Sequence, residues 1–114
     1  TASGRLTGID TSRSQHLLAV IAGDERRLRP LLAPGAGAAR SIDRTDGLRV
    51  VFATGDIVHL RPSGNAPELR CYAESDTPSA AARLCGECLE RARRELRPLR
   101  SPGNDWRPRQ DSNL

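Results

Sequence analysis

The chain has 114 residues, enough for one domain, and because only 3% of them are aromatic its core must come from Leu, Val, Ile and Ala. No apolar run approaches the roughly 20 residues of a membrane span, the first residues do not resemble a signal peptide, and three cysteines are too few for a disulfide scaffold. Reduced thiols in a cytoplasmic protein are therefore expected, and the net charge of +4, from 18 arginines against 14 acidic residues, is only weak evidence for a nucleic-acid partner.

The first third of the chain predicts one helix. Residues 1–8 are polar and follow no period, so we expect a hinge or linker remnant there. Asp10 or Thr11 can cap a helix over residues 12–22, because a short side-chain oxygen accepts amide hydrogens of the first turn. The apolar stripe of this helix consists of Leu17, Leu18 and Ile21.

The segment that follows is ambiguous until residue 40. Three leucines between residues 24 and 32 fit a helical turn, but Pro30 removes an amide donor there. Residues 33–39 are rich in alanine and glycine and predict a flexible loop.

The middle of the chain predicts four short strands joined by turns. The expected strands cover residues 41–43, 48–53, 57–60 and 69–74. Turn-forming residues at 45–47 and 54–56 separate the first three strands. Consecutive strands with short connections pair antiparallel.

A helix over residues 79–96 closes the pattern. Thr77 and Pro78 form a typical helix start, with a capping hydroxyl and a proline in the first turn. Its apolar face consists of Leu84, Cys85, Cys88, Leu89, Ala92 and Leu96. We therefore expect an α+β domain over residues 9–96, with two helices packed on a four-stranded, mainly antiparallel sheet in the order α-β-β-β-β-α. Residues 97–114 lack a period and predict a disordered tail.

One stretch interrupts the strand pattern with residues that suit an anion. Arg61 offers paired donors that match two oxygens of a phosphate. Ser63 and Asn65 add a hydroxyl and an amide, and Gly64 lets the backbone approach a ligand closely. These residues predict a phosphate or carboxylate cradle. A tight connection rich in turn formers remains the alternative.

The region from Gly55 to Glu74 resembles the C-terminal domain of the α-D-phosphohexomutases, most closely the phosphomannomutase/phosphoglucomutase branch. The family loop is typically Arg-Pro-Ser-Gly-Thr-x-Pro, followed by a strand that contains arginine. Here Asn65 replaces the common Thr, and Ala66 replaces a common Glu. Residues 43–49 and 1–3 also resemble the family, so the likeness covers about residues 1–96.

The resemblance implies a role within a larger enzyme. Family members have four domains, which supply in turn a phosphoserine, a metal loop that usually holds magnesium, a sugar-recognition loop, and a mobile lid with the phosphate-binding loop. The family reaction interconverts hexose 6-phosphate and hexose 1-phosphate through a bisphosphate. The first three elements are not recognisable in this chain, so we expect a lid domain that is inactive alone and contains neither catalytic nor metal-binding residues.

The resemblance also assigns roles to particular residues and partners. It implies that Arg61, Ser63, Gly64 and Asn65 grip the non-transferring phosphate and that Arg70 supports them. The implied partners are mannose or glucose 1- or 6-phosphate and the remaining domains of the enzyme, without nucleic acid or membrane. Magnesium is expected for the full-length enzyme only.

Two other hypotheses compete with this one. A small arginine-rich module could bind nucleic acid, but residues 1–96 carry 14 arginines against 12 acidic residues, and a net charge of +2 would release few counterions. Cys85 and Cys88 form a C-x-x-C pair, but a structural zinc site needs four ligands. Only Cys71, His16 and His59 remain as candidates, so core packing is the favoured interpretation, with metal or redox chemistry as the alternative. Both histidines are expected on exposed surfaces.

Overall fold

A five-stranded antiparallel sheet organises the structure, a computed structural model that describes residues 1–96. The tail predicted over residues 97–114 lies outside the described residues. The elements are β1 (Ala2–Thr7), α1 (Thr11–Ala22), α2 (Glu25–Leu32), β2 (Ala39–Asp43), β3 (Leu48–Phe52), β4 (Ile57–Pro62), β5 (Glu68–Glu74) and α3 (Pro78–Leu96). In space the strands follow the order β1-β5-β4-β3-β2, and every neighbouring pair is antiparallel.

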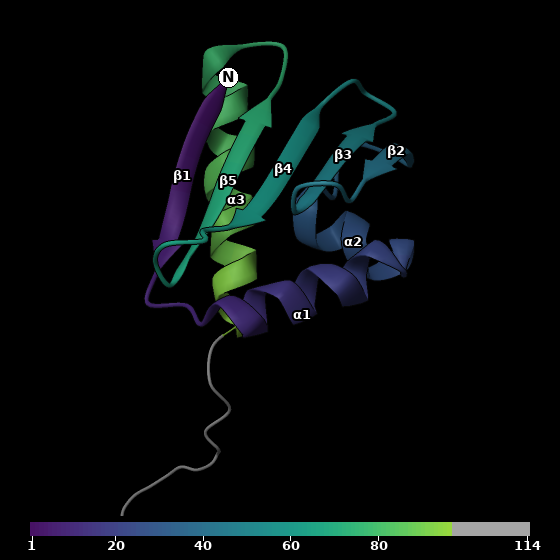
Figure 1. Ribbon diagram of the computed structural model, residues 1–114. Coiled ribbons are helices and arrows are strands. Elements are labelled where there is room, and N and C mark those ends of the chain that lie inside the picture. The colour runs from purple at the N-terminus through teal and green to yellow at the C-terminus, as the bar shows by residue number, and fades with distance from the viewer. Residues whose placement is uncertain (97–114) are drawn as a thin grey trace, which may run out of the picture.

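The helices cover one face of this sheet and leave the other open. In Figure 1, α3 runs behind β1 and β5, and α1 lies across the strand ends near the end of β4. The inward side chains alternate along the central strands. The strand part of the core consists of Leu48, Val50, Phe52, Val58, Leu60, Leu69, Cys71 and Ala73. Their neighbours along the strands face the uncovered side, which we call the open face.

The prediction of a linker over residues 1–8 is wrong for most of that segment. Residues 2–7 form β1, which pairs with β5 from Ala2 opposite Ala73 to Thr7 opposite Glu68. Gly4 lets β1 approach α3, because a Cβ there would lie 2.9 Å from the Cδ1 atom of Leu89. The sheet therefore has five strands and not the four that we predicted.

The ambiguous segment after Gly23 forms a third helix, so the prediction of two helices is also wrong. The side chain of Asp24 caps α2 by accepting a hydrogen bond from the Arg26 amide at 3.1 Å. Leu28, Leu31 and Leu32 are all buried. Pro30 is tolerated because it lies in the last turn of an eight-residue helix, where burial of the leucines outweighs one lost hydrogen bond.

The remaining predicted elements are confirmed within one or two residues. The Thr77 hydroxyl caps α3 by accepting a hydrogen bond from the Ala80 amide at 3.0 Å. The predicted apolar face of α3 points into the core, with Leu84 only half-buried. The α+β class and the antiparallel sheet are thus as expected. None of the helices among residues 1–96 combines the length and apolar character needed to cross a membrane.

Candidate phosphate-binding site

The predicted anion loop connects β4 to β5 as a short, internally bonded turn. The Ser63 amide donates to the Glu68 carbonyl at 2.9 Å, which closes the loop at its base. At the tip, the Asn65 amide donates to the Ser63 Oγ atom at 3.3 Å. Ile9, just after β1, donates its amide to the Pro67 carbonyl at 2.9 Å. These bonds hold the loop in one shape, which reduces the ordering cost of binding a ligand.

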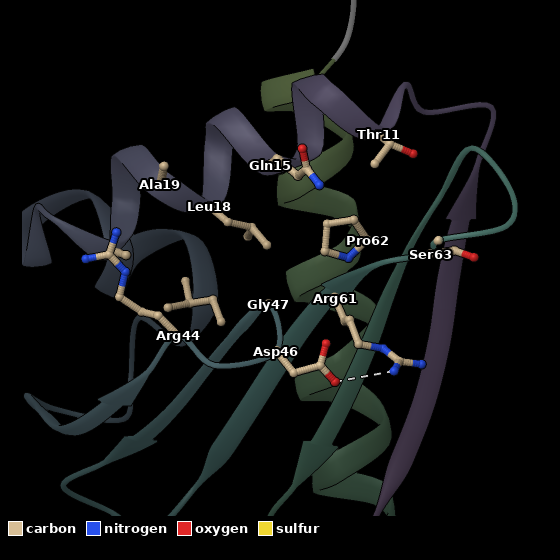
Figure 2. Close-up of a pocket in the computed structure, with 13 residues that line it drawn as sticks. Thr11, Gln15, Leu18, Ala19, Arg44, Asp46, Gly47, Arg61, Pro62 and Ser63 are labelled. Atoms are coloured by element: carbon tan, nitrogen blue, oxygen red, sulfur yellow. Dashed lines mark hydrogen bonds and ion pairs between the residues drawn. The ribbon is translucent and has the colours of Figure 1, made fainter.

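Arg61 emerges from the end of β4 beside an acidic residue of the β2–β3 turn. Its Nη1 atom lies 3.4 Å from the Oδ2 atom of Asp46 (Figure 2). The Asp46 carbonyl in turn lies 2.6 Å from the Nε2 atom of His59. Asp46 thus links the β2–β3 turn to β4 through its contacts with Arg61 and His59.

Gly47 lets the β2–β3 turn approach β4 this closely. It has a φ of 74°, and a Cβ at this position would lie 2.2 Å from the Leu60 carbonyl oxygen. Only glycine fits this combination of positive φ and contact with neighbouring backbone. The same turn is braced by Asp43, which accepts a hydrogen bond from the Thr45 amide at 2.9 Å. That bond holds the pKa of Asp43 below its ordinary value.

A cavity of about 330 Å³ lies between the loop, the β2–β3 turn and α1 (Figure 2). Its walls are Thr11, Gln15, Leu18, Ala19 and Ala22 of α1, Arg44, Asp46, Gly47 and Leu48 of the turn and β3, and Arg61, Pro62, Ser63 and Gly64. Arg44 and the pair formed by Arg61 and Ser63 stand at different ends of this space. The cavity thus combines cationic and hydroxyl groups with an apolar wall, a lining suited to a small polar anion.

The structure brings only part of the predicted site to this cavity. Arg61, Ser63 and Gly64 line it, whereas Asn65 is exposed at the tip of the loop. Gly64 has open space around it, since a Cβ there would meet no atom within 4 Å. Arg70 does not line the cavity; it lies on the open face of the sheet beside Tyr72. The hydrogen bond with Arg70 lowers the pKa of Tyr72 and raises that of the guanidinium.

Several lining residues were missed by sequence reasoning. Asp46 and Gly47 belong to a recognisable turn signal, but their position beside Arg61 depends on the pairing of β3 with β4. Thr11 and Gln15 belong to the predicted first helix and reach the loop only because of how α1 crosses the sheet. The position of α1 relative to the sheet is a tertiary feature, which the pattern of neighbouring residues does not predict.

The other candidate groups stay apart from the cavity. Cys71, Cys85 and Cys88 are buried together, and the Cys85 thiol donates to the Cys71 carbonyl at 3.7 Å. Burial raises the pKa of Cys85 to about 12, so this thiol is protonated at neutral pH. Among residues 1–96, no three His, Cys, Asp or Glu side chains gather in a way that could hold a metal ion. His16 is exposed on α1, and His59 is half-buried on the open face.

A comparison with known protein families matches most of the described residues. The model of the phosphoglucomutase/phosphomannomutase C-terminal domain matches residues 15–91. The chain belongs to this family. The matched range takes in most of α1, all of α2, four of the five strands and most of α3, and it includes the β4–β5 loop.

Two curated proteins are similar to this chain in sequence. A phosphomannomutase of Sinorhizobium fredii (strain NBRC 101917 / NGR234) is 42% identical over 87 residues, which are 76% of this chain and 18% of that protein. A phosphomannomutase of Salmonella muenchen is 35% identical over 96 residues, 84% of this chain and 20% of that protein. The chain thus spans about a fifth of the length of these relatives.

Proposed function

We propose that this domain is the phosphate-binding lid of a phosphohexomutase that interconverts hexose 6-phosphate and hexose 1-phosphate. The observation that carries the proposal is the closed β4–β5 loop, which presents Arg61, Ser63 and Gly64 at the rim of the 330 Å³ cavity. Membership of the phosphoglucomutase/phosphomannomutase C-terminal family supports it.

The loop residues suit the phosphate that stays attached while the other end of the sugar reacts. Arg61 supplies charge-assisted hydrogen bonds. Ser63 accepts a bond from the Asn65 amide, which leaves its own hydrogen available to a phosphate oxygen. Gly64 leaves room for the ligand beside the backbone. A lid that grips the remote phosphate uses that binding energy to orient the reacting end.

The chemistry itself belongs to other parts of the proposed enzyme. We assign the phosphoryl-carrying serine, the sugar-recognition loop and magnesium to domains outside this chain. We therefore expect the 114-residue chain, purified by itself, to bind phosphate but to show no turnover of mannose 1-phosphate or glucose 1-phosphate.

Binding by the isolated chain should be weak. Charge-assisted hydrogen bonds contribute about 1.5–3 kcal/mol each, and immobilising the ligand offsets much of that gain. We expect a dissociation constant of about 1 mM or higher for mannose 6-phosphate. Inorganic phosphate should compete about equally, because the sugar ring has little to contact.

An NMR titration of the amide signals with mannose 6-phosphate tests the proposal. The largest shifts should fall on residues 61–65, and Arg61→Ala should weaken binding at least about tenfold, equivalent to roughly 1.4 kcal/mol. Arg83→Ala, on the exposed side of α3, is the matched control and should leave binding unchanged. Shifts centred on α3, or equal effects of the two substitutions, would place the site elsewhere.

A further inference from the structure

One acidic side chain lines the cavity beside the β4–β5 loop. Among the described residues that form the walls of this cavity, Asp46 alone is acidic, and its carboxylate lies against the guanidinium group of Arg61. A carboxylate at this position repels a phosphate that approaches the same guanidinium group, and it therefore lowers the affinity of the site for phosphate. A site built only for tight anion binding would not place an acid here.

The backbone of Asp46 is fixed by contacts that do not involve its carboxylate. The Nε2 atom of His59 donates to the Asp46 carbonyl at 2.6 Å. The next residue, Gly47, packs against the backbone of β4, where an added Cβ would lie 2.2 Å from the Leu60 carbonyl oxygen. These contacts hold the β2–β3 turn beside Arg61 independently of the Asp46 carboxylate.

The carboxylate itself forms a loose and exposed ion pair (Figure 2). Its Oδ2 atom lies 3.4 Å from the Nη1 atom of Arg61, which is longer than the roughly 2.7–2.9 Å of a strong charge-assisted bond. The exposed fraction of the side chain is 63% for Asp46 and 37% for Arg61. Because a surface pair of this kind contributes little stability, a stronger anion can replace the carboxylate at low cost.

We propose that Asp46 is an internal competitor of the phosphate: its carboxylate pairs with Arg61 in the empty site and gives way when a phosphate binds. The inference rests on the proposed function and adds a control of affinity to it. A phosphate monoester carries a charge of about −1.5 to −2 at neutral pH, so it attracts Arg61 more strongly than one carboxylate does. When the phosphate leaves, Asp46 again supplies the counter-ion of Arg61, which lowers the cost of release. A lid gains from this limit on affinity, since tight binding of the ground state does not speed the reaction.

The experiment compares the binding of inorganic phosphate by the 114-residue chain and by its Asp46→Asn variant. NMR follows the amide signals of residues 61–65 at constant ionic strength, with sodium chloride as the balancing salt. Asparagine keeps the shape of the side chain and the backbone contacts but removes the charge. Asp46→Asn should tighten phosphate binding about fivefold, the effect of one unit charge about 4 Å away in water.

Asp43→Asn is the matched control, because it removes an equal charge beside the same turn. The Asp43 carboxylate accepts a hydrogen bond from the Thr45 amide and does not line the cavity. Asparagine can accept the same bond through its Oδ1 atom, so the turn should keep its shape. Salt screens a charge that is not in contact with the ligand, and this variant should therefore change phosphate affinity by less than about twofold.

The carbon NMR signals of the side-chain carboxyl groups report the exchange directly. Phosphate should shift the Asp46 carboxyl signal of the unsubstituted chain and leave the Asp43 carboxyl signal in place. A role of Asp46 in the stability of the turn alone would not produce this difference.

Unchanged or weaker phosphate binding by Asp46→Asn would overturn the competition, and so would an equal gain in the two variants. A normal response of residues 61–65 together with an unchanged affinity counts against the competitor role alone. If residues 61–65 respond to phosphate in none of the three proteins, the proposed function fails and the competition fails with it.

Discussion

Gly47 is the residue on which the geometry around Arg61 depends most directly. A methyl group at this position would have to displace the backbone of β4, because its Cβ atom would lie only 2.2 Å from the Leu60 carbonyl oxygen. We expect Gly47→Ala to lower the free energy of unfolding by about 2–4 kcal/mol, combining positive-φ strain with overpacking. Urea denaturation measures this change.

Gly55 provides the matched control for that substitution. It also has a positive φ, 93°, but a Cβ there would meet no atom within 4 Å. Gly55→Ala should therefore lower the free energy of unfolding by only about 1–2 kcal/mol, the cost of the backbone conformation alone. Equal losses for the two variants would show that contact with β4 is unimportant.

The buried thiols predict how stability changes at high pH. Burial raises the pKa of Cys85 from 9.0 to about 12, and that of Cys71 is raised as well. A raised pKa means that the unfolded state loses its proton first, so this contribution is complete below pH 9 and disappears as the pH rises toward 12. Stability should fall by up to about 1.4 kcal/mol per pH unit for each such thiol.

Urea denaturation at several pH values between 8 and 11 measures this slope. Cys85→Ala should make it shallower, whatever the variant costs at neutral pH. An unchanged slope would contradict the assignment of Cys85 as a buried, protonated thiol.

At the residue level, the site could be predicted only where it is continuous in sequence. Arg61, Ser63 and Gly64 follow one another in a loop, so their residue types alone point to an anion. Asp46 lies beside Arg61 only because β3 pairs with β4 in the observed register. Arg5 lies opposite Arg70 only because residues 2–7 form a strand, where we expected a linker. Such neighbours depend on tertiary structure, which a local pattern does not contain.

At the level of elements, α2 shows packing prevailing over a local rule. Pro30 argues against a helix, yet the three leucines of α2 are buried against the rest of the core. β1 shows the opposite failure, because its polar composition hides a strand whose pairing partner is remote in sequence. A helix with a capping residue and a long apolar face, such as α3, can be predicted from its own sequence without knowledge of its packing partners.

Arg91 of α3 joins two elements by capping the C-terminal end of α2. Its Nε atom donates to the Leu31 carbonyl at 2.7 Å, and its Nη2 atom donates to the Leu32 carbonyl at 3.3 Å. Arg91→Met keeps the aliphatic stem but removes both bonds. We expect it to lower the free energy of unfolding by about 1.5–3 kcal/mol, as for hydrogen bonds from a charged group.

Arg94→Met is the matched control for the Arg91 substitution. Arg94 is more exposed and lies 3.5 Å from Glu90, an ion pair that contributes little at a surface. Its loss should change the unfolding free energy by less than about 0.5 kcal/mol. Equal effects in thermal or urea denaturation would contradict the capping role of Arg91.

At the level of the whole molecule, the antiparallel sheet follows from its short connections, since β2 to β5 are consecutive in sequence and adjacent in space. β1 is the exception: it comes first in the chain and completes the edge of the sheet beside β5. The first strand and the last helix of the described chain therefore pack around the same strand, with β1 beside β5 and α3 packed against both.

This arrangement determines where the domain can be cut without harm. Removing residues 1–8 would leave the amide and carbonyl groups of β5 without partners along one edge, and would uncover the side of Leu89 that Gly4 now meets. An unpaired strand edge beside an apolar patch is a template for pairing with another molecule. In size-exclusion chromatography with light scattering, the chain shortened to begin at Ile9 should self-associate increasingly with concentration, whereas the full chain should not. A chain that began at the first helix would thus expose the edge of β5 as a site for aggregation.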